Sequence, residues 1–124
     1  MQTLETLKAA RALITPPHAW ARGAFGATTW HPFTPKGAAT TAQDPAAVCW
    51  CSLGSLIKVT GQALYAQADG PIRALAEAIQ RKVPDADALV DPSQTIASFN
   101  DAHEHDDVLA VFDDAIAHLE KLHD

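Results

Sequence analysis

Apolar residues recur at helical spacing through much of this chain. The clearest case lies near the carboxyl end, at Val108, Val111, Phe112, Ala115, Ile116, Leu119 and Leu122. Steps of three and four residues place these side chains on one face of a helix, because an α-helix repeats every 3.6 residues. The acidic pair Asp106 and Asp107 suits the positive end of such a helix. The pattern predicts a fold built mainly from packed amphipathic helices.

Length and composition agree with that prediction. The chain has 124 residues, and 48% of them are hydrophobic, so it can bury a core. Much of the hydrophobic fraction is alanine, which favours closely packed helices over a β-sandwich. We therefore predict a mostly α fold, a single helical domain over residues 1–124 with about five helices.

Glycine, proline and capping residues predict where the other helices begin and end. Helices are expected over residues 3–14, 71–83 and 92–100. The candidate caps are Thr3, Asp69 and Asp91. Proline at the first helical position is tolerated because its missing N–H would have no partner there. Proline pairs or single prolines beyond the last turns end the first two of these helices.

Residues 24–43 show no helical period. They are rich in glycine, threonine, proline and alanine. We predict a long early loop, or one short β-hairpin that pairs Phe25–Trp30 with Ala38–Thr41. A loop of this length in a small domain often carries function. This one is a candidate to cover the side of the chain that holds Cys51.

The stretch from Cys49 to Leu56 holds both cysteines and one of the three tryptophans. Asp44-Pro45 predicts a central helix from Pro45 to about Ala66. A strand through Ala47 to Leu53 is the weaker alternative, because the apolar pattern runs too long for one strand. Two cysteines separated by one residue of a helix point too far apart to bridge easily, so both are expected to be free thiols.

Gly54 interrupts the predicted central helix next to Cys51. Glycine inside a helix costs about 0.5–1 kcal/mol relative to alanine. Two explanations remain open: close packing of another helix or loop, or the close approach of a ligand beside Cys51. Both predict that something covers the Cys51 side of this helix.

Three short motifs occur in order along nearly the whole chain. They are Trp20-Ala-Arg-Gly23-Ala, Trp50-Cys51-Ser-Leu-Gly54-Ser55-Leu56 and Phe99-Asn100-Asp101. Followed by an amphipathic helix, they resemble an uncharacterised family of small bacterial and phage proteins, a domain of unknown function. The resemblance implies that these motifs belong together, and it implies no activity. Family members usually carry a longer turn after the Asn-Asp pair than residues 102–105 provide here.

Two classes of function remain open. The first is a small non-enzymatic binding module, linked by the resemblance to phage or mobile elements, that binds a protein partner or a small polar ligand. Its candidate ligand-binding residues are Trp20, Arg22, Cys51, Ser55, Asn100 and Asp101. The alternative is a cysteine-dependent enzyme using Cys51, which requires a nearby histidine or helix N-terminus to lower the pKa of the thiol. Asn100 and Asp101 either form a structural turn or line a polar pocket with Arg22 and Ser55.

Other classes are not expected. The net charge is -6 and no basic cluster occurs, which argues against nucleic-acid binding. No apolar run approaches the ~20 residues that span a bilayer, and the first residues lack the features of a signal peptide, so a cytoplasmic location is expected. His103 and His105 lie in an acidic turn that could hold zinc or iron. We nevertheless expect no metal, no cofactor and no catalytic residue.

Overall fold

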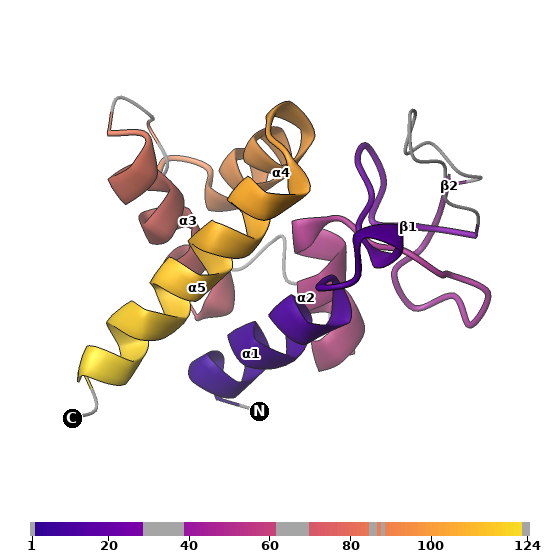
Figure 1. The fold of residues 1–124 in the computed structure, drawn as a ribbon, viewed down its shortest axis with the longest axis horizontal. Coiled ribbons are helices and arrows are strands. Elements are labelled where there is room, and N and C mark those ends of the chain that lie inside the picture. The colour runs from indigo at the N-terminus through magenta and orange to yellow at the C-terminus, as the bar shows by residue number, and fades with distance from the viewer. Residues whose placement is uncertain (1, 29–38, 62–69, 85–86, 88, 123–124) are drawn as a thin grey trace.

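Five helices make up most of the described chain (Figure 1). The computed structural model describes residues 2–28, 39–61, 70–84, 87 and 89–122. The helices are α1 (Thr3–Leu13), α2 (Ser52–Thr60), α3 (Pro71–Lys82), α4 (Pro92–Ala102) and α5 (His105–Leu122). A 3-10 turn, η1 (Pro17–Ala19), and two short strands, β1 (Gly26–Ala27) and β2 (Ala39–Thr40), complete the described elements. The predicted mostly α fold is confirmed.

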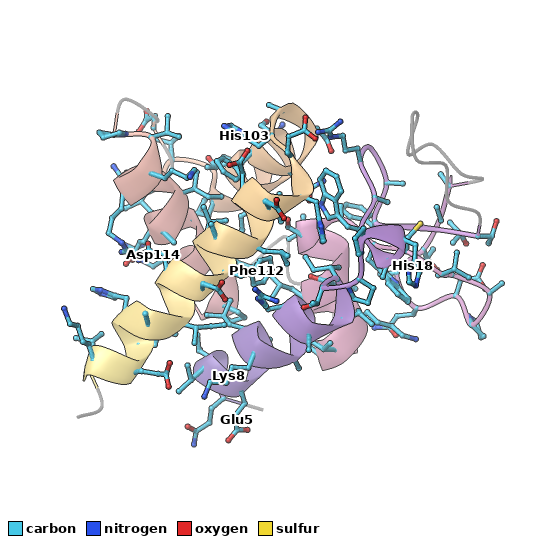
Figure 2. All side chains as sticks on the ribbon, viewed as in Figure 1. Glu5, Lys8, His18, His103, Phe112 and Asp114 are labelled. Atoms are coloured by element: carbon cyan, nitrogen blue, oxygen red, sulfur yellow. The ribbon has the colours of Figure 1, made fainter. Side chains whose placement is uncertain are left out.

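The helices pack around one main apolar core. The long helix α5, yellow in Figure 1, packs on α1 and α3, while α2 packs on α1 and α4. Phe112 is fully buried at the centre of the molecule, where α5 faces α1 (Figure 2). The predicted stripe of α5 is buried over its first three turns, but Leu122 at its end is 67% exposed. On the surface, Arg11 of α1 donates two hydrogen bonds to the carboxylate of Asp113 in α5.

Capping residues predicted the start of α4 correctly but not that of every helix. Asp91 caps α4 as expected, because its side chain accepts a hydrogen bond from the Gln94 N–H at 3.2 Å. The expected cap of α1 is wrong, since Gln2 occupies that position and makes no side-chain capping bond. Asp69 lies outside the described residues. The predicted end of α4 is also wrong, because the helix continues past Asn100 to Ala102.

The prediction that the central helix begins at Pro45 is wrong. The helix α2 begins at Ser52, because the preceding backbone pairs with distant segments instead. Trp50 N–H donates to the Ala19 carbonyl, and Trp50 carbonyl accepts from Ala21 N–H, both at 2.9 Å. Cys49 and Trp50 thus form isolated β-bridges, so the weaker strand alternative describes this part of the segment better.

Two local features set the bounds of the corrected helix. Asp44 does not cap it, because its carboxylate accepts from the Ala46 N–H and the Thr40 hydroxyl and closes a tight turn. Gly61 follows the last residue of α2 with φ at 71°, a left-handed conformation that glycine adopts without strain. The rest of the predicted helix, up to Ala66, lies outside the described residues.

A short antiparallel pair occupies part of the early loop. Gly26 pairs with Thr40 and Ala27 with Ala39, in the register that a hairpin between the two predicted stretches would have. Residues 29–38, which include the predicted hairpin end at Trp30, lie outside the described residues. Among the helices that the structure describes, none has the length and apolar character needed to cross a membrane.

Candidate functional site

Asn100 joins three segments of the chain at a point without solvent access. Its Oδ1 accepts hydrogen bonds from Trp20 Nε1 at 2.7 Å, from Ser52 N at 2.9 Å and from Ser52 Oγ at 2.7 Å. Its Nδ2 donates to the Ala21 carbonyl at 3.0 Å and to Asp101 Oδ1 at 3.2 Å. Buried polar groups need such partners, because an unpaired one is costly. We call Trp20, Ser52 and Asn100 the asparagine junction.

The interpretation of Asn100 and Asp101 as a structural turn is wrong. Both residues are helical in α4, and Asn100 lies on its buried face. The partners of Asn100 come from the segment after η1 and from the start of α2, which are distant in sequence. Local spacing gives no signal for such contacts, so the sequence favoured the commoner local role.

Asp101, one residue further on, lies at the surface of the asparagine junction. Its Oδ1 accepts from the Gly23 N–H at 2.9 Å. Gly23 has φ at 74°, so the chain turns sharply there and aims its N–H at the carboxylate. This contact fixes the position of the Asp101 side chain relative to the segment that follows Trp20.

Arg22 closes the carboxyl end of α4. Its Nη2 donates to the His103 carbonyl at 2.5 Å and pairs with Glu104 Oε1 at 3.4 Å. Its guanidinium lies over the Trp20 ring, with Cζ 5.0 Å from the ring centroid. A cation at a helix C-terminus meets the negative end of the helix dipole. Arg22 therefore stabilises the carboxyl end of α4 against the segment that holds Trp20.

Cys51 is the capping residue of α2. Its Sγ accepts a hydrogen bond from the Gly54 N–H at 3.2 Å, and its side chain is buried. Burial raises the pKa of the Cys51 thiol to about 11, although the hydrogen bond from Gly54 lowers it and the charge of Asp101 raises it slightly. Burial therefore raises the pKa of the thiol by more than the N–H groups at the start of α2 lower it. Both cysteines are free thiols, as predicted.

The backbone at Phe25 covers α2 at Gly54. A Cβ added at Gly54 would overlap the Phe25 carbonyl oxygen and lie 2.6 Å from its carbon. Any side chain there would force the two segments apart. The prediction that something covers the Cys51 side is confirmed, and close packing of a loop is the explanation that holds at Gly54 itself.

A cavity of about 350 Å3 opens next to this contact. Its described lining residues are Gly23, Ala24, Phe25, Ala39, Thr40, Cys51, Ala97 and Asp101. Glycine, alanine and one phenylalanine make up most of the lining, and Asp101 is the one charged residue among them. We call this the Asp101 cavity. Its volume lies at the small end of the range for ligand sites.

Five of the six predicted ligand-binding residues lie at the asparagine junction or at the Asp101 cavity. Trp20, Asn100 and Arg22 gather around the asparagine junction, while Cys51 and Asp101 also border the Asp101 cavity. Ser55 lies in neither, because it is fully buried and its hydroxyl donates to the Ser52 carbonyl within α2. Sequence reasoning missed Ser52 and Phe25. Ser52 is the first residue of α2 and follows its capping residue, Cys51. It could have been recognised only if the start of α2 had been predicted correctly.

The two histidines of the acidic turn point to different partners. His103 lies at the end of α4 (Figure 2). Its ring stacks on that of Phe99, with ring centroids 3.9 Å apart. His105 Nε2 lies 2.6 Å from the Ile14 carbonyl oxygen, and its ring lies 5.4 Å from that of Trp20. Within the described part of the chain, no group of three or more His, Cys, Asp or Glu side chains is arranged to hold a metal ion.

Fold and site together define a small helical protein in which a buried asparagine ties three segments together beside a small cavity. The chain belongs to DUF6197, a family of unknown function, whose model matches residues 1–118. The resemblance to an uncharacterised family is confirmed to that extent. No curated protein matches the chain, and no solved structure matches it either.

Proposed function

We propose that this protein is a non-enzymatic binding module that holds a small polar ligand in the Asp101 cavity. One observation carries the proposal: a carboxylate held in place at the cavity wall has no cationic side chain beside it among the described lining residues. Asp101 Oδ1 is held by the Gly23 N–H and the Asn100 amide, so Oδ2 is left for a ligand. The complementary ligand carries a positive charge or several N–H donors.

The apolar part of the wall adds to this preference. Three alanines and Phe25 line the same cavity as Asp101. A small apolar body next to a cationic group therefore matches both kinds of surface, since apolar walls supply affinity and a few polar groups fix orientation. The proposed ligand is a small amine of this type.

The chemistry of Cys51 favours binding over catalysis. With the pKa of its thiol raised to about 11, roughly one molecule in ten thousand carries a thiolate at neutral pH. No histidine of the described chain makes a hydrogen bond to Cys51 that would activate it. A cysteine-dependent enzyme remains the alternative, and it requires a rearrangement that uncovers Sγ.

The wider setting of the proposal comes from the sequence. Free thiols suit a reducing compartment, so we propose a cytoplasmic location. The resemblance to small bacterial and phage proteins suggests a role linked to phage or mobile elements. Neither the location nor the role alters the test of the cavity, which depends only on Asp101.

Binding can be tested with fragment-sized amines and their neutral analogues of the same shape. Ligand-detected NMR should show the amines binding to the wild-type protein more strongly than the neutral partners. Asp101→Asn keeps the oxygen that accepts from Gly23 but removes the charge, so amine binding should fall by about tenfold or more. Asp106→Asn, an exposed acid in the first turn of α5, is the matched control. Equal binding of amines and neutral analogues, unchanged in Asp101→Asn, would refute the proposal.

A further inference from the structure

A second concave surface runs along α4, on a face different from that of the Asp101 cavity. This groove of about 460 Å3 lies between α3 and α4. The residues of α4 and its two caps that line it are Asp91, Gln94, Thr95, Ser98, Phe99, Ala102 and His103. Their spacing of three and four residues follows one helical face, whereas Ala97 and Asp101 turn toward the other cavity. At 1.5 Å per residue the groove is about 16 Å long.

The floor of the groove is apolar and rigid. Ile79 and Phe99 belong to the main core and are nearly inaccessible, so their positions are fixed by packing. The His103 ring stacks flat on Phe99 at one end. Along the wall, Val90 is 76% exposed, the largest exposure among the large hydrophobic side chains described. Val83 and Ala102 add accessible apolar surface to the same groove, so Val90 is not an isolated exposed side chain.

The charged side chains that line the groove are acidic and lie at one of its ends. Asp87 and Asp91 line it near the start of α4, and no lysine or arginine occurs among its described lining residues. Asp91 also caps α4 through one oxygen, which leaves its second oxygen for a partner. A cation that reaches this end would meet two carboxylates without displacing an existing ion pair.

We infer that the α3–α4 groove docks a short segment of a partner protein. The segment presents two or three apolar side chains to the accessible apolar groups of the groove, at Val83, Val90 and Ala102. It places a lysine or arginine against Asp87 and Asp91. The length of the groove matches about three turns of helix, and apolar anchors at helical spacing are how helix-binding grooves read their partners. This inference stands apart from the proposed ligand site, because the two surfaces share no lining residue.

The test is a selection from a displayed library of random twelve-residue peptides, with the wild-type protein as bait. The enriched peptides should share two or three apolar residues and at least one lysine or arginine. Val90→Glu should weaken the best peptide by about tenfold or more, because it puts a charge on the apolar wall. Asp87→Lys should weaken it by roughly fivefold, the scale of one exposed ion pair, and added salt should reduce that difference.

The control is Val48→Glu, which changes another exposed valine, at 48% exposure, that does not line the groove and should leave peptide binding unchanged. Far-UV circular dichroism checks that each variant keeps the wild-type fold. Enrichment of acidic peptides, or of peptides that bind Val90→Glu as tightly as wild type, would overturn the inference. So would concentration-dependent dimers that Val90→Glu abolishes, because they would assign the groove to a second copy of the chain.

Discussion

Asn100 and Asp101 are neighbours in sequence, but they face two different environments. The Asn100 amide is sealed inside, and its oxygen already accepts three hydrogen bonds from Trp20 and Ser52. The Asp101 carboxylate borders a cavity, and one of its oxygens is left without a partner among the described residues. The difference shows that a polar motif can hold a fold together on one side and offer a binding group on the other. Hydrogen-bond capacity that the protein itself fills is not available to a ligand.

The largest loss of stability should come from a substitution at the buried Asn100. Asn100→Ala removes the hydrogen bonds that this one side chain makes to the indole N–H of Trp20, the N–H of Ser52 and the carbonyl of Ala21. We expect a loss of about 3–5 kcal/mol in the free energy of unfolding, measured by urea denaturation. A loss below about 1 kcal/mol would break the comparison, because it would mean that Asn100 is not what joins the segments.

The contact between α2 and the early loop should come next. Gly54→Ala places a methyl group against the Phe25 backbone, which has no rotamer to move. We expect a loss of about 2–3 kcal/mol in stability. Gly61→Ala is the matched control, because no neighbouring atom lies near its added methyl group and only its left-handed backbone is strained, at about 1 kcal/mol. Equal losses in the two variants would contradict the close contact.

A third prediction concerns the pH dependence of stability. The folded-state pKa of Cys51 lies at about 11, above the ordinary thiol value of 9.0. The unfolded chain therefore loses this proton first, so the stabilisation is complete below pH 9 and falls as the pH rises toward 11. The loss should reach about 2 kcal/mol by pH 11. Cys51→Ser keeps a capping oxygen without titrating there, so the difference between the two denaturation curves isolates the thiol. A constant difference from pH 8 to 11 would show that Cys51 is not buried as described.

The smallest effect should come from the partly exposed side chain beside the junction. Arg22→Gln removes the guanidinium from Trp20 and weakens the bond to the His103 carbonyl. Because this side chain is 30% exposed, we expect a loss of only about 1 kcal/mol in thermal stability. Asp113→Asn, which breaks a pair on the far surface, should cost less. A loss of stability for Arg22→Gln as large as that for Asn100→Ala would contradict this, because Arg22 would then stabilise the fold as much as the buried Asn100 does.

The helical part of the fold was accessible from sequence because its signals are local. Asp91-Pro92 marked the start of α4, and the period of apolar residues marked α5. The start of α2 was not accessible, because Cys49 and Trp50 pair with Ala27 and Trp20, which are distant in sequence, and because a cysteine, Cys51, stands where a usual capping residue is expected. Residue propensities describe local preferences, so they do not predict which distant segments pair.

The candidate site was only half accessible for a similar reason. The motifs pointed to Trp20, Asn100 and Asp101 as a group, and the structure brings them together. Which of them faces inward depends on the phase of α4. Asn100 lies four residues after the buried Ile96 and so shares its face, whereas Asp101 lies beyond the predicted end of the helix near Asn100. Ser52 and the backbone of Phe25 join through tertiary contacts that have no sequence period.

The most direct test of the division between Asn100 and Asp101 is a titration that observes both sides at once. An amine that binds the wild-type protein is added while two-dimensional 15N NMR follows the backbone N–H of Gly23 and the indole N–H of Trp20. The Gly23 signal should move, because its hydrogen bond ends on Asp101, while the Trp20 indole signal should stay in place, because Asn100 already holds its proton. Asp101→Asn should abolish the Gly23 shift. Movement of the Trp20 indole signal without the Gly23 signal, or the absence of any shift with every amine, would contradict the account.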